Sequence, residues 1–578
     1  MAIVRATAQM PELSTRDRLA VRGLLAAQAR QGMFTRLLNS RALRWRYGAA
    51  RADKLLLVPP DLRTADSSFV TEYCQGYFGL AGTPVELNEL SPFDVIPPNQ
   101  EWQTALLGFG WLNHFAASTD PDSAEHARAL VVDWIKRRHD TNDPCWMPEV
   151  LGRRLVSWLS HADLLLSDTD AKTFDLIMRS VGRQFIRLVA TWRRAPQGLP
   201  RLQALTCLLM ANLCIAGHDR KIARIQRFFL DELSAQILED GGHIDRNPST
   251  VVTVLLDLLP LEKCFSAREI EEPELLTTAR NRMFGFLRFL RLGDGNLARF
   301  NGVGVPDGAS LARLLAYDDV EHDRLRGGAS QQSGYVRLGN GNTVVLADIG
   351  AAPDLELATR SQAGCLSFEM SIAGSPVFVN GGLPGAAHAD WIPAARSTAN
   401  HNTLCLGETS SSRLVRHAKF EGLFGGTPIA EPHIVDSTLS MRLGSQSFTA
   451  KHDGYLQRFG IVHFRELTLS PDGRQLTGVD RLGPPDEEGD LRLKQDLPFA
   501  IHFHLHPDVT VKAIKDQSCH EITLLDGSVL VFTCEGARAT VEESVYFADS
   551  LGPRVALQIV LRGATFGESL MRWTVSHQ

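Results

Sequence analysis

The sequence changes character near residue 330, and this change constrains the fold more than any other feature. Between residues 12 and 290, apolar side chains recur at three- and four-residue spacing, which places an apolar stripe on one face of a helix. One such stripe consists of Phe174, Ile177, Val181, Phe185 and Leu188. The segment 251–261 is almost wholly apolar, so we predict a buried helix that ends at Pro260. This half therefore predicts about ten helices in a toroid or large bundle.

Beyond residue 330 the chain reads as short strands. Segments such as 343–349 and 366–372 are rich in β-branched and apolar residues, and Gly, Asn, Pro and Asp separate them. The stretch Gly339-Asn340-Gly341-Asn342 is a strong hairpin signal. Repeated strands with turn signals over this length favour an antiparallel β-sandwich.

These patterns divide the chain into three parts. We expect a basic helical segment at 1–50, a helical domain at 51–325 and a β-domain at 326–578. In the first part, arginines alternate with Leu and Ala. A basic amphipathic helix can lie on a membrane surface. We favour the alternative, in which the arginine stems pack on the domain, because no Trp or Phe cluster marks the apolar face.

Composition limits the choice of partners and compartment. The 578 residues carry a formal net charge of -6, which gives no reason to expect a nucleic-acid partner. No apolar run reaches the roughly 18 residues that a membrane helix needs, and Arg22 interrupts the nearest signal-like stretch. Nine scattered cysteines without a CxxC pair indicate reduced thiols. We therefore expect a cytoplasmic protein without a transmembrane segment, and we leave a homodimer open.

Common catalytic motifs are missing from the sequence. It contains no GxxxxGK[ST], HExxH or GxSxG pattern, which disfavours a phosphate-loop enzyme, a zincin and an α/β-hydrolase.

One polar cluster lies ahead of a predicted helix. Asp240, His243, Asp245, Arg246 and Asn247 fall in a single turn-rich stretch. Polar loops at the mouth of a helical barrel are common ligand sites, because a rigid scaffold positions them. The structural alternative is a helix cap with local charge pairing.

A second polar cluster spans residues 396–403, with the sequence RSTANHNT. Arg396, His401 and Asn402 could contact a sugar, and the neutral imidazole could hold a metal ion. The structural alternative is a loop whose side chains bond their own backbone. Downstream, His452 and Tyr455 lie in a turn that either lines an inter-domain cleft or anchors the β-domain.

The order of these features resembles the heparinase II/III-like family of polysaccharide lyases. The resemblance rests on WMPE at 146–149, followed by Arg153, Arg154 and Trp158, on DGGH at 240–243, on GCLSFE at 364–369 and on HNT at 401–403. It covers residues 30–570 and is firmest between 330 and 480. It implies an incomplete (α/α) toroid followed by an antiparallel β-sandwich, with a carbohydrate cleft between them.

The resemblance also implies a reaction. Lyases of this kind cleave beside a uronic acid by β-elimination: a donor stabilises charge on the carboxylate, a base removes the C5 proton and an acid protonates the leaving oxygen. We assign the base to His243 or His401, the carboxylate contacts to Arg201 and Asn402, and the acid to Asp245 or Tyr455. Further candidates for substrate contact are Asp240, Arg246, Asn247, Gln362, Glu369, Arg396, Glu149, Arg154, Trp111, His114 and His452. No cofactor is required, although some relatives hold a structural zinc in the β-domain, with His401 at a ligand position.

The sequence departs from the family pattern at three positions. Where characterised lyases carry Asn-His, a Tyr-His pair and a His, this chain carries Pro200-Arg201, Thr250 and Gln362. Thr250 and Gln362 cannot transfer protons near neutral pH, whereas the fork of Arg201 can clamp a carboxylate.

Three functions therefore remain open. The leading prediction is a lyase that acts on an acidic oligosaccharide. A non-catalytic saccharide-binding protein and a glycoside hydrolase with paired carboxylates are the alternatives, and Asp240, Asp245 and Glu149 are the candidates for such a pair.

Overall fold

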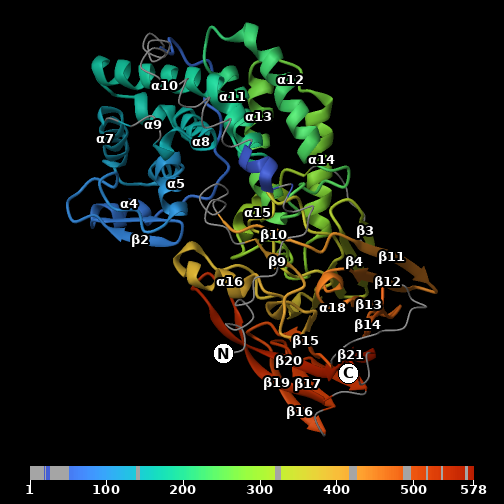
Figure 1. Ribbon diagram of the computed structural model, residues 1–578. Coiled ribbons are helices and arrows are strands. Elements are labelled where there is room, and N and C mark those ends of the chain that lie inside the picture. Colours follow the sequence, from blue (N-terminus) through green and yellow to red (C-terminus); the bar gives the residue numbers. More distant parts are fainter. Residues whose placement is uncertain are drawn as a thin grey trace.

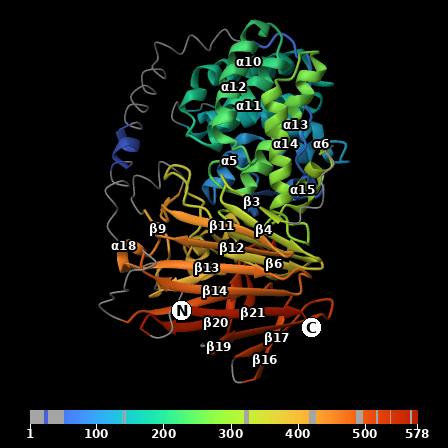
Figure 2. The ribbon, with the colours of Figure 1, turned by 90° about the vertical axis from the view of Figure 1, so that its right-hand side faces the viewer.

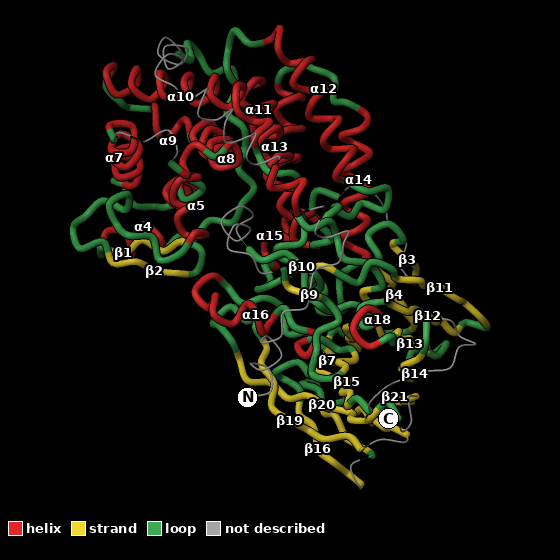
Figure 3. Tube along the Cα trace, in the orientation of Figure 1, coloured by secondary structure: helices red, strands yellow, loops and turns green. Residues whose placement is uncertain are grey.

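The computed structural model describes residues 19, 21–26, 51–137, 139, 143–318, 327–415, 426–485, 496–515, 518–535, 538–566 and 570–577. Helices gather at one end of the molecule and strands at the other (Figures 1 and 3). The predicted architecture, a helical toroid followed by an antiparallel sandwich, is confirmed. The expected boundary at 325/326 and most of the segment 1–50 lie outside the described residues.

The helical domain follows one order along the chain. Its helices are α4 (Phe69–Cys74), α5 (Gln100–Gly108), α6 (Leu112–Ala117), α7 (Ser123–Lys136), α8 (Pro148–Ser160), α9 (Ala162–Leu166), α10 (Ala171–Thr191), α11 (Leu199–Cys214), α12 (Asp219–Gln236), α13 (Pro248–Ala267), α14 (Glu274–Phe289) and α15 (Gly308–Leu315). A small hairpin of β1 (Tyr77–Leu80) and β2 (Thr83–Glu86) and the short 3-10 helices η2 (Pro144–Trp146) and η3 (Trp192–Arg194) complete it.

Local signals explain several of these helices. The Asp170 carboxylate accepts hydrogen bonds from Lys172 N and Thr173 N and so begins α10, whose predicted apolar stripe is largely buried. Helix α11 packs against α8, α12 and α13 and is apolar on nearly all sides, as a central helix must be. Helix α13 does not end at Pro260 as predicted, but continues to Ala267.

The β-domain consists of three main antiparallel sheets (Figure 2). A five-stranded sheet contains β3 (Gly327–Ser330), β4 (Tyr335–Asn340), β5 (Thr343–Asp348), β6 (Phe368–Ile372) and β7 (Ser375–Phe378) in that order. The predicted hairpin joins β4 to β5, with Asn340 opposite Thr343. An eight-stranded sheet has the order β11 (Val435–Arg442), β12 (Ser445–His452), β13 (Val462–Leu469), β14 (Gln475–Gly483), β21 (Leu570–His577), β18 (Val529–Glu535), β17 (Cys519–Thr523) and β16 (Thr510–Lys515).

A four-stranded sheet completes the sandwich. Its order is β19 (Arg538–Tyr546), β20 (Arg554–Ala564), β15 (Pro498–His504) and β8 (Leu404–Leu406). A separate two-stranded ladder pairs β9 (Arg413–Leu414) with β10 (Ile429–Ala430). Short helices in the connections include α16 (Ile392–Ala395), α18 (Leu456–Phe459), η4 (Ala386–Trp391) and η5 (Thr398–Asn400).

Two hydrophobic cores hold the domains together. In the β-domain, Trp573 of β21 stacks on Phe368 of β6 and meets Phe503 of β15 edge to face, so one core joins all three sheets. The helical core extends across the boundary, because Tyr335 of β4 and Leu346 of β5 belong to it. The two domains therefore share buried apolar surface where they meet.

The described part of the N-terminal segment is helical and packs on the β-domain. Val21 and Leu25 contact a small cluster that contains Leu355, Val415 and Ala430, while Arg22 is exposed. Apolar side chains make this contact, so the predicted packing of the arginine stems stays a prediction. Among the described residues, no helix combines the length and apolar character that crossing a bilayer requires.

Candidate functional site

The turn between α12 and α13 forms a corner of the helical domain, which we call the 240–247 corner. The Asp240 carboxylate accepts from Gly242 N and, across the domain boundary, from Ser333 N. His243 is buried; its Nδ1 accepts from Asp245 N, and its Nε2–H donates to Gln236 Oε1 over 2.8 Å. Both imidazole nitrogens of His243 are thus already hydrogen-bonded.

The other corner residues are also committed to local structure. The Asp245 carboxylate accepts from Asn247 N and from Thr250 Oγ1. Asn247 caps α13 by accepting from Ser249 N. Thr250 is at the position where the resemblance places a Tyr-His pair, and its hydroxyl orients Asp245 instead.

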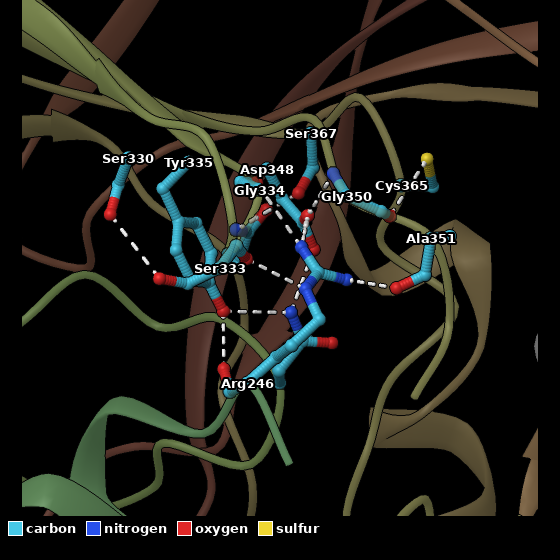
Figure 4. A network of polar contacts seen from close by, with 12 residues as sticks. Arg246, Ser330, Ser333, Gly334, Tyr335, Asp348, Gly350, Ala351, Cys365 and Ser367 are labelled. Atoms are coloured by element: carbon cyan, nitrogen blue, oxygen red, sulfur yellow. Dashed lines mark hydrogen bonds and ion pairs between the residues drawn. The ribbon is translucent and has the colours of Figure 1, made fainter. Parts of the chain in front are cut away.

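Arg246 joins the corner to the five-stranded sheet (Figure 4). Its guanidinium forms an ion pair with Asp348 at the end of β5 and donates to Ser333 O at 2.8 Å and to Ala351 O at 2.7 Å. The Tyr335 hydroxyl donates to the Arg246 carbonyl. Asp348 and Arg246 are both nearly fully buried, and Asp348 helps to raise the pKa of Arg246 against the opposing effect of burial. Arg246 is therefore a bridge between the domains.

A cavity of about 870 Å³ opens beside this bridge. It lies where the end of α12 and the 240–247 corner meet the 349–357 loop and the edge strand β11. Besides Arg246, its polar lining residues are Gln331, Gln332, Asp354, Asp436, Ser437 and Thr438. The Asp436 carboxylate pairs with Lys451 of β12, and the Gln332 amide bonds to Glu239. None of its described lining residues is a His, Tyr, Lys or Cys. Sequence reasoning missed these polar residues, which are scattered over three separate segments and share no local motif.

The 396–403 loop lies inside the β-domain. His401 is 1% exposed, and its Nδ1–H donates to Ser397 O over 2.8 Å. Its Nε2 has no hydrogen-bond partner among the described residues. Burial lowers the pKa of His401 to about 4, so the ring is neutral near pH 7. Asn402 donates to Phe368 O and accepts from His504 N. Neither residue lines the cavity.

The same loop begins with a buried cation. The Arg396 guanidinium donates to three carbonyls, those of Ala358, Ser361 and Thr427. Gln362 is likewise buried, accepting from Gly302 N and donating to Ala395 O. These contacts brace the backbone, as the structural alternative for this cluster proposed.

Three more candidates of the β-domain are buried in it. The Tyr455 hydroxyl donates to Leu404 O at 2.9 Å, and burial raises its pKa well above the usual value. His452 Nδ1 accepts from Gly454 N, and its Nε2 faces His463 at 3.3 Å. The Glu369 carboxylate pairs with Arg299 and accepts from Asn380 N, yet burial raises its pKa to about 7.

The candidates of the helical domain are spread over separate places. Trp111 donates to Leu106 O, His114 accepts from Asp66 N, and Arg201 donates to Ala195 O. Glu149, in the first turn of α8, and the fully buried Arg154 complete this group. None of these five lines the cavity. Of all the predicted site residues, the structure brings Arg246 alone to the described cavity wall.

His401 does not fit a zinc site in the described part of the chain. Its Nε2 could bind a metal ion. Its Nδ1–H donates a hydrogen bond to Ser397 O, and a contact of this kind usually orients a metal-binding histidine. However, the described residues place no group of three potential ligands around it. We therefore assign no metal to this position.

Comparison with known proteins identifies the family. The model for the heparinase II/III-like C-terminal domain matches residues 323–574. FtsZ-localized protein C of Caulobacter vibrioides is 30% identical over 479 residues, which cover 81% of this chain and 80% of that protein.

Solved structures share the fold at low sequence identity. A crystal structure of heparinase III superposes with a TM-score of 0.71 at 13% identity, over 93% of this chain and 88% of that one. Heparan sulfate lyase HepC of Pedobacter heparinus gives a TM-score of 0.58 at 15% identity, over 92% and 87%. Together with the sequence matches, the toroid-plus-sandwich architecture establishes that the chain belongs to the heparinase II/III-like family.

Proposed function

We propose that this protein binds a saccharide in the cavity between its two domains and does not cleave it. The observation that carries the proposal is the side-chain set of the cavity wall. A β-elimination needs a base and an acid that exchange protons near neutral pH, usually His or Tyr. The described wall offers amides, hydroxyls, the Asp354 carboxylate and an arginine that is already paired.

The predicted acid–base residues support the same proposal by their positions. His243, His401 and Tyr455 are buried, and each holds a backbone or side-chain partner inside its own domain. A base must come within hydrogen-bond reach of the proton that it removes, which a side chain enclosed in a domain core does not do.

The wall suits a neutral sugar. Gln331 and Ser437 can exchange hydrogen bonds with sugar hydroxyls. The size of the cavity falls within the range of about 300–1,000 Å³ typical of small-molecule sites. Asp354 would repel the carboxylate of a uronic acid. We therefore propose a neutral oligosaccharide in place of the acidic one predicted from the resemblance.

Three readouts on one glycan panel test this function. Neutral and uronate-containing oligosaccharides are incubated with the protein. Ultraviolet absorbance detects an unsaturated product, a reducing-end assay detects hydrolysis, and calorimetry measures binding. We expect saturable binding of a neutral glycan without either product. Unsaturated product would instead establish the lyase, and new reducing ends alone would establish a hydrolase.

Paired variants locate the binding. Ser437→Ala and Asp354→Ala should each weaken binding about 10-fold, the effect of one lost hydrogen bond to a bound ligand. Thr477→Ala, on the solvent face of β14, is the matched control and should bind like the wild type. Equal loss in the control, or no loss in either cavity variant, would place the ligand elsewhere.

A second proposal rests on the 30% identity with the FtsZ-localized relative, which exceeds the identity with the lyase structures. We propose that this chain also localises with FtsZ in its own cell. None of the nine cysteines, all of which the structure describes, forms a disulfide, which suits the reducing compartment that the sequence predicts. A fluorescent fusion should form a band that coincides with FtsZ and disperses when FtsZ is depleted. A fluorescence pattern that does not coincide with FtsZ, or that is unchanged when FtsZ is depleted, would exclude this role.

A further inference from the structure

A second set of chemically reactive side chains lies in the helical domain, far in sequence from the cavity wall. His139 follows α7, Asp143 caps η2, and Cys145 lies within η2. Their ligand atoms all lie within 4.8 Å of one another, and they form the one such group of three among the described residues. Cys145 is fully buried, while His139 and Asp143 are 14% and 29% exposed, so the group opens to solvent on one side.

The three side chains are oriented as metal ligands usually are. The Nε2–H of His139 donates to Trp134 O at 3.0 Å, which leaves the Nδ1 lone pair facing Asp143 Oδ2 at 3.5 Å. Two ligands about 2.0–2.1 Å from a tetrahedral zinc are separated by about 3.3 Å, close to this distance. Asp143 Oδ1 accepts from Cys145 N, which holds the carboxylate with Oδ2 toward His139.

Aromatic rings fix the histidine in place. The His139 ring stacks on Trp134, with centroids 4.6 Å apart, and meets Trp146 edge to face. These contacts restrict rotation of the imidazole before any ion binds, which reduces the entropic cost of binding.

We propose that His139, Asp143 and Cys145 bind a zinc ion, with water in the fourth position. The ligand set of one imidazole, one carboxylate and one thiolate suits zinc better than magnesium or calcium, which prefer oxygen ligands alone. Binding replaces the Cys145 thiol proton, so one proton is released as the zinc–sulfur bond forms.

Charged side chains surround the site. Arg154 lies 4.2 Å from the Trp134 ring centroid, and Arg187 lies 3.8 Å from that of Trp146. These cations repel a bound ion, so its affinity depends on both anionic ligands.

Metal titration of the full chain tests the site. The protein is stripped with a chelator and titrated with zinc alone, and cobalt is substituted to observe the thiolate-to-metal absorption. We expect about one equivalent of zinc per chain, a higher melting temperature with zinc, and the thiolate band with cobalt. His139→Gln and Asp143→Asn should each weaken zinc binding at least about 100-fold, since even outer-shell partners contribute about 10–100-fold.

The variants separate this site from alternatives. Asp143→Asn keeps the oxygen that accepts from Cys145 N, so its metal-free fold should melt as the wild type does. Cys74→Ser is the matched control, because Cys74 lies 3.8 Å from His126 in a rival Cys–His pair. It should retain full zinc affinity. Three results would each overturn the proposal. They are loss of stoichiometric zinc binding in Cys74→Ser, retained zinc binding in His139→Gln, and no zinc binding by the wild type.

Discussion

The 240–247 corner and the 396–403 loop look alike in sequence but differ in what they connect. Both are dense in Asn, Arg and His. The corner bonds across the domain boundary, through Arg246 to Asp348 and through Asp240 to Ser333, and it borders the cavity. The loop bonds within the β-domain, where Arg396 and His401 contact carbonyls of neighbouring turns.

This difference shows how to interpret polar clusters. Buried polar groups must be hydrogen-bonded, and irregular backbone inside a domain needs many donors and acceptors. A dense polar motif can therefore brace a turn without any chemistry. What distinguishes the corner is its location at the junction of two domains, where binding cavities commonly form.

Asp348→Asn should have the largest effect, because it leaves the buried Arg246 guanidinium without its carboxylate. Breaking a buried ion pair from one side costs about 3–5 kcal/mol. We expect lower stability in urea and faster hydrogen exchange at both the corner and β5, together with weaker saccharide binding. Glu542→Gln, which removes an exposed pair with Arg562, is the control and should cost less than about 1 kcal/mol. Unchanged exchange at the corner would contradict the bridging role.

His401→Ala should have a smaller effect that is confined to the β-domain. It removes a buried ring and its bond to Ser397 O, at a cost of about 2–3 kcal/mol. The melting temperature should fall while saccharide affinity stays at the wild-type value. The opposite result, lost binding with an unchanged melting curve, would place His401 in the site and remove the contrast between the two clusters.

Acid should weaken the loop through the same histidine. Burial holds the pKa of His401 near 4, whereas an unfolded histidine titrates near 6.5. Between these values the unfolded chain binds a proton that the folded chain does not. Stability is therefore complete above about pH 6.5 and falls as the pH decreases, by about 2 kcal/mol at pH 5.

His401→Gln isolates this contribution. Its stability should depend less steeply on pH than that of the wild type between pH 6.5 and 4, measured by urea unfolding at several pH values. His401 also helps to lower the pKa of the buried His504, so the difference reports His401 together with its effect on His504. Parallel curves would show that His401 titrates normally.

Sequence reasoning reached the fold more fully than the site, for physical reasons. Apolar periodicity and turn residues are local, and they located the stripe of α10 and the β4–β5 hairpin. Pro260 was predicted to end its helix, but the buried leucines on either side outweigh the lost backbone bond. Arg246 was recognised, yet its partner Asp348 lies 102 residues away, and no local pattern reveals such a contact.

Tyr455→Phe should have the smallest effect. It distinguishes a catalytic acid from a structural residue that stabilises the β-domain. Burial raises the pKa of Tyr455, so its phenol stays protonated and donates to Leu404 O at the start of β8. Phenylalanine keeps the ring packing and removes that donor, so we expect a loss of about 1 kcal/mol in thermal unfolding. Glycan binding should not change, because the hydroxyl points into the β-domain. If the variant instead kept its stability and lost an activity on glycans, Tyr455 would reach substrate, and the β-domain cluster would be a site after all.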